Sequence, residues 1–253
     1  MEENMFIFKL QHLSLLLNIM YISVILPAPA MVDVISLPVN GTNLTCKCLQ
    51  LLLQPYGGWK QIRGPHLHDQ KDWNFYLQNK CKIIFPIRDP RDRVVSYAYK
   101  VKKLSPKARA SIADLTFDVI TQYGMVNYNY LVRIPFYKKI GDFSEYYKIY
   151  FPWFNYPHLL IIFFEDLVGP KAGGSREKQL ATIQKIAEFI EIDASENEIE
   201  YVADNLWGDT SSFRDSKIGR WKDVFTDRHR EAFKKTCMAQ FLIDFGYELD
   251  TLW

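Results

Sequence analysis

The chain has 253 residues, 48% of them hydrophobic and 24% charged, a composition that excludes a disordered, collagen-like or coiled-coil protein. Its 31 lysines and arginines nearly balance 29 aspartates and glutamates, so the net charge of +2 does not predict a nucleic-acid partner, and any anion site must be local. Four cysteines are too few for a disulfide scaffold, and their spacing does not fit a zinc site. We therefore expect a single domain with reduced thiols and no metal, located in the cytoplasm.

The first 30 residues differ in character from the rest of the chain. Residues 5–27 are mostly apolar and lead to Ala28-Pro29-Ala30, which has the small residues typical of a signal-peptidase site. Polar residues interrupt the apolar run, and acidic residues precede it where a signal peptide carries basic ones, so no stretch of about 18 apolar residues remains for a spanning helix. We interpret residues 1–30 as an extension of a cytoplasmic protein and residues 31–253 as its domain. Membrane association through residues 5–27, as a signal peptide or anchor, is the alternative.

Beyond residue 31, short apolar runs alternate with amphipathic stretches. Three runs lack polar alternation, as expected for strands covered on both faces, and they span residues 32–37, 82–87 and 159–164. Helices are predicted over residues 42–53, 92–102 and 175–190, and a further helix is predicted to start at Ser105-Pro106. The capping box of Ser195 and Glu198 predicts the start of a helix that runs toward Trp207. The last predicted helix runs from about Asp227 to Gly246. This alternation predicts an α/β fold, with a mainly parallel sheet flanked by helices in a single domain. Ligands of such folds bind beyond the carboxyl ends of the strands, so the segments that follow the three strands are the first candidates for a site.

The loop after the first predicted strand has features of a phosphate-binding loop. It reads Pro38-Val39-Asn40-Gly41-Thr42-Asn43, with the glycine where the chain enters the next helix. Such a turn directs several backbone N–H groups and the positive end of the helix dipole at one point, which favours a phosphate group. The loop matches neither GxxxxGK(S/T) nor GxGxxG, so a plain turn in which Thr42 or Asn43 caps the helix is the alternative.

Arg88 marks a second candidate site, at the end of the second predicted strand. A proline-directed turn follows it, and Ser96 lies in the next helix. The guanidinium group can bind a phosphate through two hydrogen bonds, and the Ser96 hydroxyl adds a neutral donor. A structural pair between Arg88 and an aspartate such as Asp92 is the alternative.

A small, basic loop late in the chain is the third candidate. Residues 212–221 read SFRDSKIGRW, in which Gly219 permits close approach of the backbone to a ligand and Trp221 can pack on the core. The alternative is an exposed basic turn.

Together the three segments resemble those of the sulfotransferase family, whose members transfer a sulfuryl group from 3′-phosphoadenosine 5′-phosphosulfate. The first loop is similar to the family's PKSGTTW loop, which binds the 5′-phosphosulfate, and residues 88–96 reproduce the RDPRDxxxS element that holds the 3′-phosphate. The late loop is similar to RKGxxGxW, and residues 164–167, FEDL, resemble the YEDL segment near the adenine. The resemblance implies a nucleotide site formed by Pro38, Asn40, Gly41, Thr42, Asn43, Arg88, Ser96, Phe164, Phe213, Arg214, Ser216 and Lys217.

The resemblance also implies a catalytic base. Residues 64–68, GPHLH, are similar to the family's THLP segment, whose histidine deprotonates the acceptor hydroxyl. A neutral imidazole suits this role because its pKa lies near the working pH. His66 is the aligned residue, but His68 lies one strand period away and could take the role instead. A metal site formed by both histidines with Asp69 lacks a further spaced ligand.

Two positions differ from the family's pattern. The lysine of the first loop, which neutralises charge on the bridging oxygen, is Val39 here, and a glycine of the late loop is Ser216. Loss of a preorganised cation costs about 2 to 4 kcal/mol of transition-state stabilisation. We therefore predict a sulfotransferase acting on a hydroxyl of a small molecule or glycan, with a catalytically impaired nucleotide-binding protein of the same fold as the alternative. A P-loop kinase is disfavoured because the Lys-Ser/Thr pair is absent from the loop.

Overall fold

A computed structural model describes residues 32–36, 39–58, 70–105, 110–126, 129, 140–148, 150–208 and 217–253 of the chain. The sequence predictions for residues 1–30, Pro38, His66, His68, Phe213, Arg214 and Ser216 lie outside the described residues. Within the described ranges, no helix combines the length and the apolar character needed to cross a membrane.

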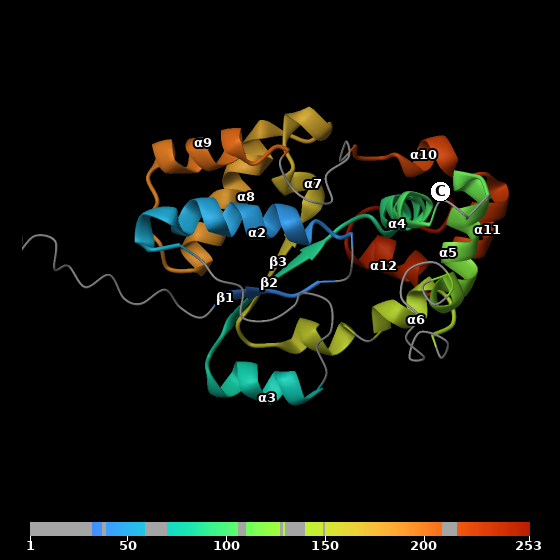
Figure 1. Cartoon of the computed structure of the whole chain (residues 1–253), viewed down its shortest axis with the longest axis horizontal. Helices are drawn as coiled ribbons and strands as arrows, with labels where there is room; N and C mark the ends of the chain where they lie inside the picture. The colour runs from blue at the N-terminus through green and yellow to red at the C-terminus, as the bar shows by residue number, and fades with distance from the viewer. Residues whose placement is uncertain are drawn as a thin grey trace, which may run out of the picture. The chain divides into compact units, whose positions relative to one another are not determined.

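The described elements alternate between strands and helices along the chain (Figure 1). The strands are β1 (Val32–Val34), β2 (Lys82–Ile87) and β3 (Leu159–Phe163). The α-helices are α2 (Thr42–Leu53), α3 (Gln70–Gln78), α4 (Pro90–Leu104), α5 (Ile112–Val126), α6 (Phe143–Lys148), α7 (Phe164–Leu167), α8 (Arg176–Phe189), α9 (Glu196–Asn205), α10 (Trp221–Val224), α11 (Asp227–Lys234) and α12 (Met238–Asp244). Short 3-10 helices are η1 (Gln54–Tyr56), η4 (Phe151–Asn155) and η5 (Pro170–Ala172).

The three strands form one parallel sheet in the order β1-β2-β3, with Ile84 of β2 paired to Val34 on one side and Leu160 on the other. The central strand β2 is buried except at Lys82, which is half-buried, as expected for a strand covered on both faces. Residues of β3 instead alternate between half-buried and buried, so the prediction of an evenly buried third strand is wrong. The predicted α/β fold, a parallel sheet flanked by helices, is confirmed.

Helices cover both faces of this sheet. In Figure 1, α2, α8 and α9 lie on one side of it, and α3 and α6 lie on the other. The first group is packed together, since α9 contacts both α2 and α8. The predicted capping box of Ser195 and Glu198 starts α9. Beyond β2, α5 packs against α4, α6 and α11, which extends the structure past the end of the strand where a ligand is expected.

Several predicted boundaries are wrong, among them the end of the first strand, which lies at Val34. The predicted single final helix is divided into α11 and α12. The Thr236 hydroxyl donates to the Phe233 carbonyl (2.7 Å) and accepts from the Met238 N–H (3.2 Å). These hydrogen bonds end α11 and start α12. Gly246, with φ +72°, lies at the predicted end. The apolar run of residues 159–164 predicts a strand that includes Phe164, but Phe164 begins α7.

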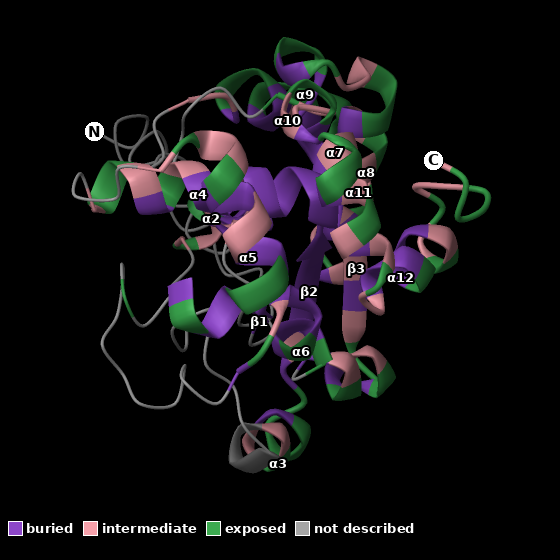
Figure 2. Ribbon diagram, turned by 90° about the vertical axis from the view of Figure 1, so that its right-hand side faces the viewer, coloured by how far each residue is buried: buried purple, intermediate pink, exposed green. Residues whose placement is uncertain are grey.

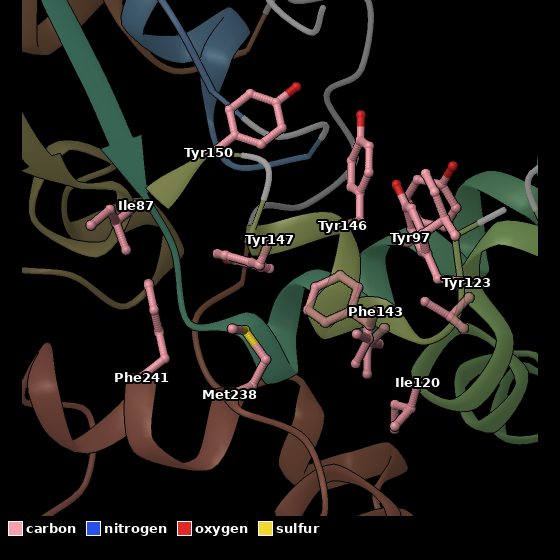
Figure 3. Packing of buried hydrophobic residues seen from close by; sticks show 14 of the residues in the cluster. Ile87, Tyr97, Ile120, Tyr123, Phe143, Tyr146, Tyr147, Tyr150, Met238 and Phe241 are labelled. Carbon is pink, nitrogen blue, oxygen red and sulfur yellow. The ribbon is translucent and has the colours of Figure 1, made fainter. Parts of the chain in front are cut away.

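Aromatic side chains fill the space between α4, α5 and α6 (Figure 3). The rings of Tyr123 and Tyr146 are stacked with their centres 4.9 Å apart, and Tyr97 lies 5.0 Å from Tyr123. All three side chains are nearly inaccessible to solvent. Figure 2 shows which residues of the described chain are buried, and these lie on the sheet and on the sides of the helices that face it. The described aromatic residues of this region therefore form core.

Candidate functional site

All three strands end at the same edge of the sheet, because they are parallel. Each strand is followed by a helix, β1 by α2 after a loop, β2 by α4 after a short turn and β3 directly by α7. The described parts of the predicted motifs are therefore brought together at this edge, where open parallel sheets bind their ligands.

Gly41 and Phe164 are in direct contact at this edge. Gly41 starts α2 with a left-handed backbone, φ +95°, which glycine adopts without strain. A Cβ atom at this position would lie 2.6 Å from Cδ2 of the Phe164 ring, closer than carbon atoms can approach. Glycine is thus required at position 41 for two reasons, the left-handed backbone and the close approach of the Phe164 ring. The contact between Gly41 and Phe164 joins two of the motifs that are predicted to bind one nucleotide.

Val39 of the first loop has a strained backbone conformation. Val39 has φ +62°, a backbone conformation that β-branched residues rarely adopt. Its side chain is half-buried and packs against the main hydrophobic cluster. Asn40 is fully buried, and its Nδ2 donates to the carbonyl of Pro86 in β2 (3.1 Å), which ties the loop to the central strand. Strained backbone that is fixed by its neighbours is typical of binding loops.

Among the described residues, no side chain caps the N-terminus of α2. The Thr42 hydroxyl is hydrogen-bonded to the Ser36 hydroxyl instead, and Thr45 Oγ1 donates to the Gly41 carbonyl (3.2 Å). The N-cap position of α2 is occupied by Gly41, so the alternative in which Thr42 or Asn43 caps the helix is wrong. The first N–H groups of a helix have no acceptor within the helix, so the positive end of the α2 dipole faces the loop.

Arg88 follows β2 and is the most informative residue of the site. Its side chain is buried, with the residue only 7% exposed, and its guanidinium carbon lies 4.4 Å from the centre of the Phe164 ring. Arg88 forms no hydrogen bond or ion pair with any described residue, and its Nε is buried without a partner. A buried charge is unfavourable unless it is paired, so this guanidinium group has the properties of an anion-binding group.

Arg91, three residues further on, is fully paired. Its guanidinium group donates to both carboxylate oxygens of Asp89, at distances between 2.8 and 3.2 Å. Asp89 also caps α4 by accepting from the Arg91 N–H (2.9 Å), and Pro90 occupies the first helical position. For this reason α4 begins two residues earlier than predicted.

Asp92 connects α4 to the late loop. Its carboxylate oxygens accept from the backbone N–H groups of Gly219 (2.7 Å) and Trp221 (2.8 Å). Burial raises the pKa of Asp92, while nearby Arg88 and the two N–H groups act in the opposite direction. The predicted alternative, a structural pair between Arg88 and Asp92, is wrong, because Asp92 binds backbone and the arginine pair in this turn is Arg91 with Asp89.

Ser96 and the described end of the late loop complete the set. Ser96 is half-buried on α4, and its hydroxyl forms no hydrogen bond within the described part of the chain. Ile218 donates its N–H to the Ala172 carbonyl (3.1 Å) and packs with Phe164, so the late loop reaches the same edge. Lys217 is exposed and is paired with Asp223 (3.2 Å).

Sequence reasoning missed Glu165, which lies directly after Phe164. Its Oε1 accepts from the Asp89 N–H (2.9 Å), and its Oε2 accepts from the Tyr247 hydroxyl (3.0 Å). Burial raises the pKa of Glu165 to about 7, although the Asp89 N–H and the Arg88 charge act to lower it. An acidic residue at the end of a buried strand was the available signal for this role.

Other features of the described residues lie apart from this edge. No group of three histidine, cysteine or acidic side chains is arranged to hold a metal ion in the part of the chain that the structure describes. Two cavities of about 420 Å³ each lie between α2 and α9 and between α5 and α11. No predicted site residue lines either cavity, so neither is the site predicted from sequence.

Comparison with protein families gives a match over more than half of the chain. The family model described as the sulfotransferase domain matches residues 58–207. The match includes Arg88, Ser96 and Phe164, but it begins after the first loop and ends before the late loop. A comparison with the curated proteins gives no match.

The fold is similar to those of three solved structures at low sequence identity. The crystal structure of mouse sulfotransferase SULT7A1 complexed with PAP is 17% identical, with a TM-score of 0.57 over 81% of this chain and 82% of that chain. Retinol dehydratase with androsterone and the inactive cofactor PAP is 16% identical, with a TM-score of 0.55 over 84% and 80% of the two chains. Retinol dehydratase with retinol and PAP is 16% identical, with a TM-score of 0.54 over 85% and 82%.

Proposed function

The chain belongs to the sulfotransferase family, and on that premise we propose that it transfers a sulfuryl group from 3′-phosphoadenosine 5′-phosphosulfate to a hydroxyl of a small-molecule or glycan acceptor. The similar structures contain PAP, which supports the choice of nucleotide. Two of them contain androsterone or retinol, which favours a small molecule over a glycan. We propose no metal and no nucleic-acid partner.

The observation that carries this proposal is the buried, unpaired guanidinium group of Arg88. The neighbouring charged groups of Asp89, Arg91 and Asp92 all have partners within the protein. Arg88 is therefore the group left to bind an anion from outside, and we assign to it the 3′-phosphate, with the Ser96 hydroxyl as a second donor.

The first loop is proposed to bind the 5′-phosphosulfate. Its backbone N–H groups at residues 40–43 and the uncapped N-terminus of α2 supply partial positive charge without a side chain. The Phe164 ring, held between Gly41 and Arg88, provides an apolar surface near the adenine. The remaining residues proposed for the nucleotide site are Pro38, Phe213, Arg214, Ser216 and Lys217.

His66 or His68 is proposed as the catalytic base. The neutral imidazole removes the proton of the acceptor hydroxyl while the acceptor oxygen forms a bond to sulfur. The bond from sulfur to the phosphate oxygen breaks at the same time, and 3′-phosphoadenosine 5′-phosphate (PAP) leaves. The loop N–H groups stabilise the charge that develops on the leaving oxygen.

A second candidate function is nucleotide binding with little or no turnover. It is favoured by Val39, which stands where the resemblance places the family's lysine. Lys217 is the first candidate to replace that lysine, but in this structure its ammonium group is paired with Asp223 at the surface. The two functions share the nucleotide site and differ only in the rate of transfer.

Transfer of label from radioactive 3′-phosphoadenosine 5′-phosphosulfate to a panel of phenols, alcohols and glycans tests the enzyme proposal. We expect one of the substitutions His66→Ala and His68→Ala to abolish transfer, because only one histidine is the base. His158→Ala is the matched control, since His158 lies in an exposed turn before β3. Nucleotide binding by a wild type that transfers no label to any acceptor would favour the second function.

We further propose that residues 31–253 form the functional domain of a cytoplasmic protein. The four cysteines all lie in the described residues and form no disulfide bond there, which fits a reducing compartment. Burial raises the pKa values of Cys46 and Cys48 to about 12, so these thiols resist oxidation and metal binding. Membrane association through residues 5–27 is the competing proposal.

A further inference from the structure

Residues 88–92, here named the arginine turn, are held by side chains from the last part of the chain. An Arg91 N–H donates to Glu248 Oε1 on the side away from Asp89. The guanidinium carbon of Arg91 lies 3.9 Å from the centre of the Trp221 ring and 4.7 Å from that of Trp253. Arg91 is thus enclosed by two carboxylates and two indole rings, and its side chain is only 3% exposed.

A second connection reaches the turn through Glu165. One oxygen of this carboxylate accepts from the Asp89 N–H and the other from the Tyr247 hydroxyl. The residue before it, Phe164, carries the ring on which the Arg88 guanidinium lies. Tyr247 therefore contacts the carboxylate that holds the backbone of the turn and that belongs to the residue next to Phe164.

The side chains that make these connections are themselves anchored. The N–H groups of Tyr247 and Glu248 donate to the Leu242 carbonyl in α12, at 2.8 and 3.2 Å. The Trp253 ring packs edge-on against those of Trp221 and Phe233, with centres 5.9 and 5.8 Å apart. A shift of the arginine turn would therefore require repacking of the region around α12.

We propose that Tyr247, Glu248 and Trp253, here named the C-terminal brace, are positioning residues that fix the direction of the Arg88 guanidinium group. The inference rests on the proposed function, since it takes the 3′-phosphate as the ligand of Arg88. The brace does not touch the nucleotide and acts through Arg91 and Glu165.

The physical reason is the presence of two arginines in one short turn. A free Arg91 would be a competing anion-binding group, and a turn released from Glu248 would present Arg88 over a wider range of directions. Asp89 and Glu248 engage Arg91 from two sides, which leaves Arg88 alone to meet the ligand. Binding groups must be held within about 0.5 Å of the productive geometry by such supporting contacts. The brace therefore sets selectivity for the 3′-phosphate rather than affinity for adenosine.

The test is the ratio of dissociation constants for adenosine 5′-phosphate and PAP, measured by calorimetry on the full chain. We expect Glu248→Gln to lower this selectivity ratio about 3- to 10-fold, because it loosens one charge-assisted contact of the turn without removing Arg88. Tyr247→Phe removes only the hydroxyl that binds Glu165 and is expected to lower the selectivity ratio less than Glu248→Gln does. If Glu248→Gln does not fold, Tyr247→Phe serves as the test variant. Asp250→Asn is the matched control, since Asp250 is exposed and, among the described residues, bonds only to the Leu252 N–H.

A lower ratio in the brace variants, with an unchanged ratio in the control, supports the proposal. Equal weakening of both nucleotides, or an unchanged ratio in both brace variants, overturns it, because a merely structural role would affect the two ligands alike. A wild-type protein that does not discriminate between the nucleotides overturns the proposed function itself. This last outcome is visible before any variant is made, so the two failures are distinguishable.

Discussion

Replacing Arg88 or Arg91 by alanine is expected to have opposite consequences, although the two arginines lie in the same turn. Arg88→Ala removes a buried cation without an ion-pair partner, so the relief of its desolvation offsets the lost contact with the Phe164 ring. The free energy of unfolding should change by less than about 1 kcal/mol. The affinity for PAP should fall about 10- to 100-fold, since a charge-assisted bidentate contact contributes about 1.5 to 3 kcal/mol. Affinity for adenosine 5′-phosphate should change little.

Arg91→Ala leaves the carboxylates of Asp89 and Glu248 without their cation and empties the space between two indole rings. Breaking a buried pair from one side costs about 3 to 5 kcal/mol, so this variant should be strongly destabilised. Urea unfolding and calorimetry with both nucleotides measure the two effects on each variant. A destabilised Arg88→Ala protein, or one that loses both nucleotides equally, would refute the assignment of Arg88 as the unpaired anion-binding group.

Four further predictions address the loop, the acidic residue that sequence reasoning missed and the N-terminal segment. Gly41→Ala should destabilise the protein by about 1 to 3 kcal/mol, through left-handed strain and collision with the neighbouring phenyl ring. Gly57 has φ +91°, but no atom of the described residues would lie within 4 Å of a Cβ there, so Gly57→Ala should show the strain alone in the same urea titration. The pKa of Glu165 is raised to about 7 in the folded state, so the folded protein binds a proton more tightly than the unfolded chain. As the pH rises from 4.5 to above 7, the wild type should therefore lose about 3 kcal/mol of unfolding free energy relative to Glu165→Gln. A difference in unfolding free energy between the two proteins that does not vary with pH would contradict this. Val39→Lys should raise kcat for label transfer, because a lysine side chain at this half-buried position can extend toward the phosphosulfate. The melting temperature should change little, because lysine is less strained than valine at φ +62°. An unchanged kcat in a folded protein that binds the nucleotide would show that the missing lysine does not limit catalysis. Deletion of residues 1–30 should leave a folded protein that binds PAP, whereas insolubility on purification would show that the segment belongs to the core.

The architecture was accessible from the sequence because its signals are local. Continuous apolar runs predicted the three strands, and the spacing of Ser195 and Glu198 predicted the start of α9. Two of the errors occur where a single polar side chain redirects the backbone. Thr236 divides the last predicted helix, and Asp89 starts α4 early, both through hydrogen bonds that hydrophobic periodicity does not represent.

The candidate site was accessible only in part, because its partners are distant in sequence. The motif around Arg88 predicted an anion-binding group, but nothing in its spacing shows which of its charged residues is left unpaired. That depends on Glu248, Gly219 and Glu165, which lie 157, 127 and 76 positions away from the residues they contact. Only folding brings these groups to the turn.

Calorimetric titration of the wild-type chain with PAP and with adenosine 5′-phosphate tests the central claim most directly. The two ligands differ only in the 3′-phosphate, so their difference in affinity isolates the contribution of the Arg88 region. We expect PAP to bind at least about 10-fold more tightly, corresponding to about 1.4 kcal/mol or more. Equal affinities, or no binding of either nucleotide, would contradict the account of this chain as a sulfotransferase that recognises its cosubstrate through Arg88.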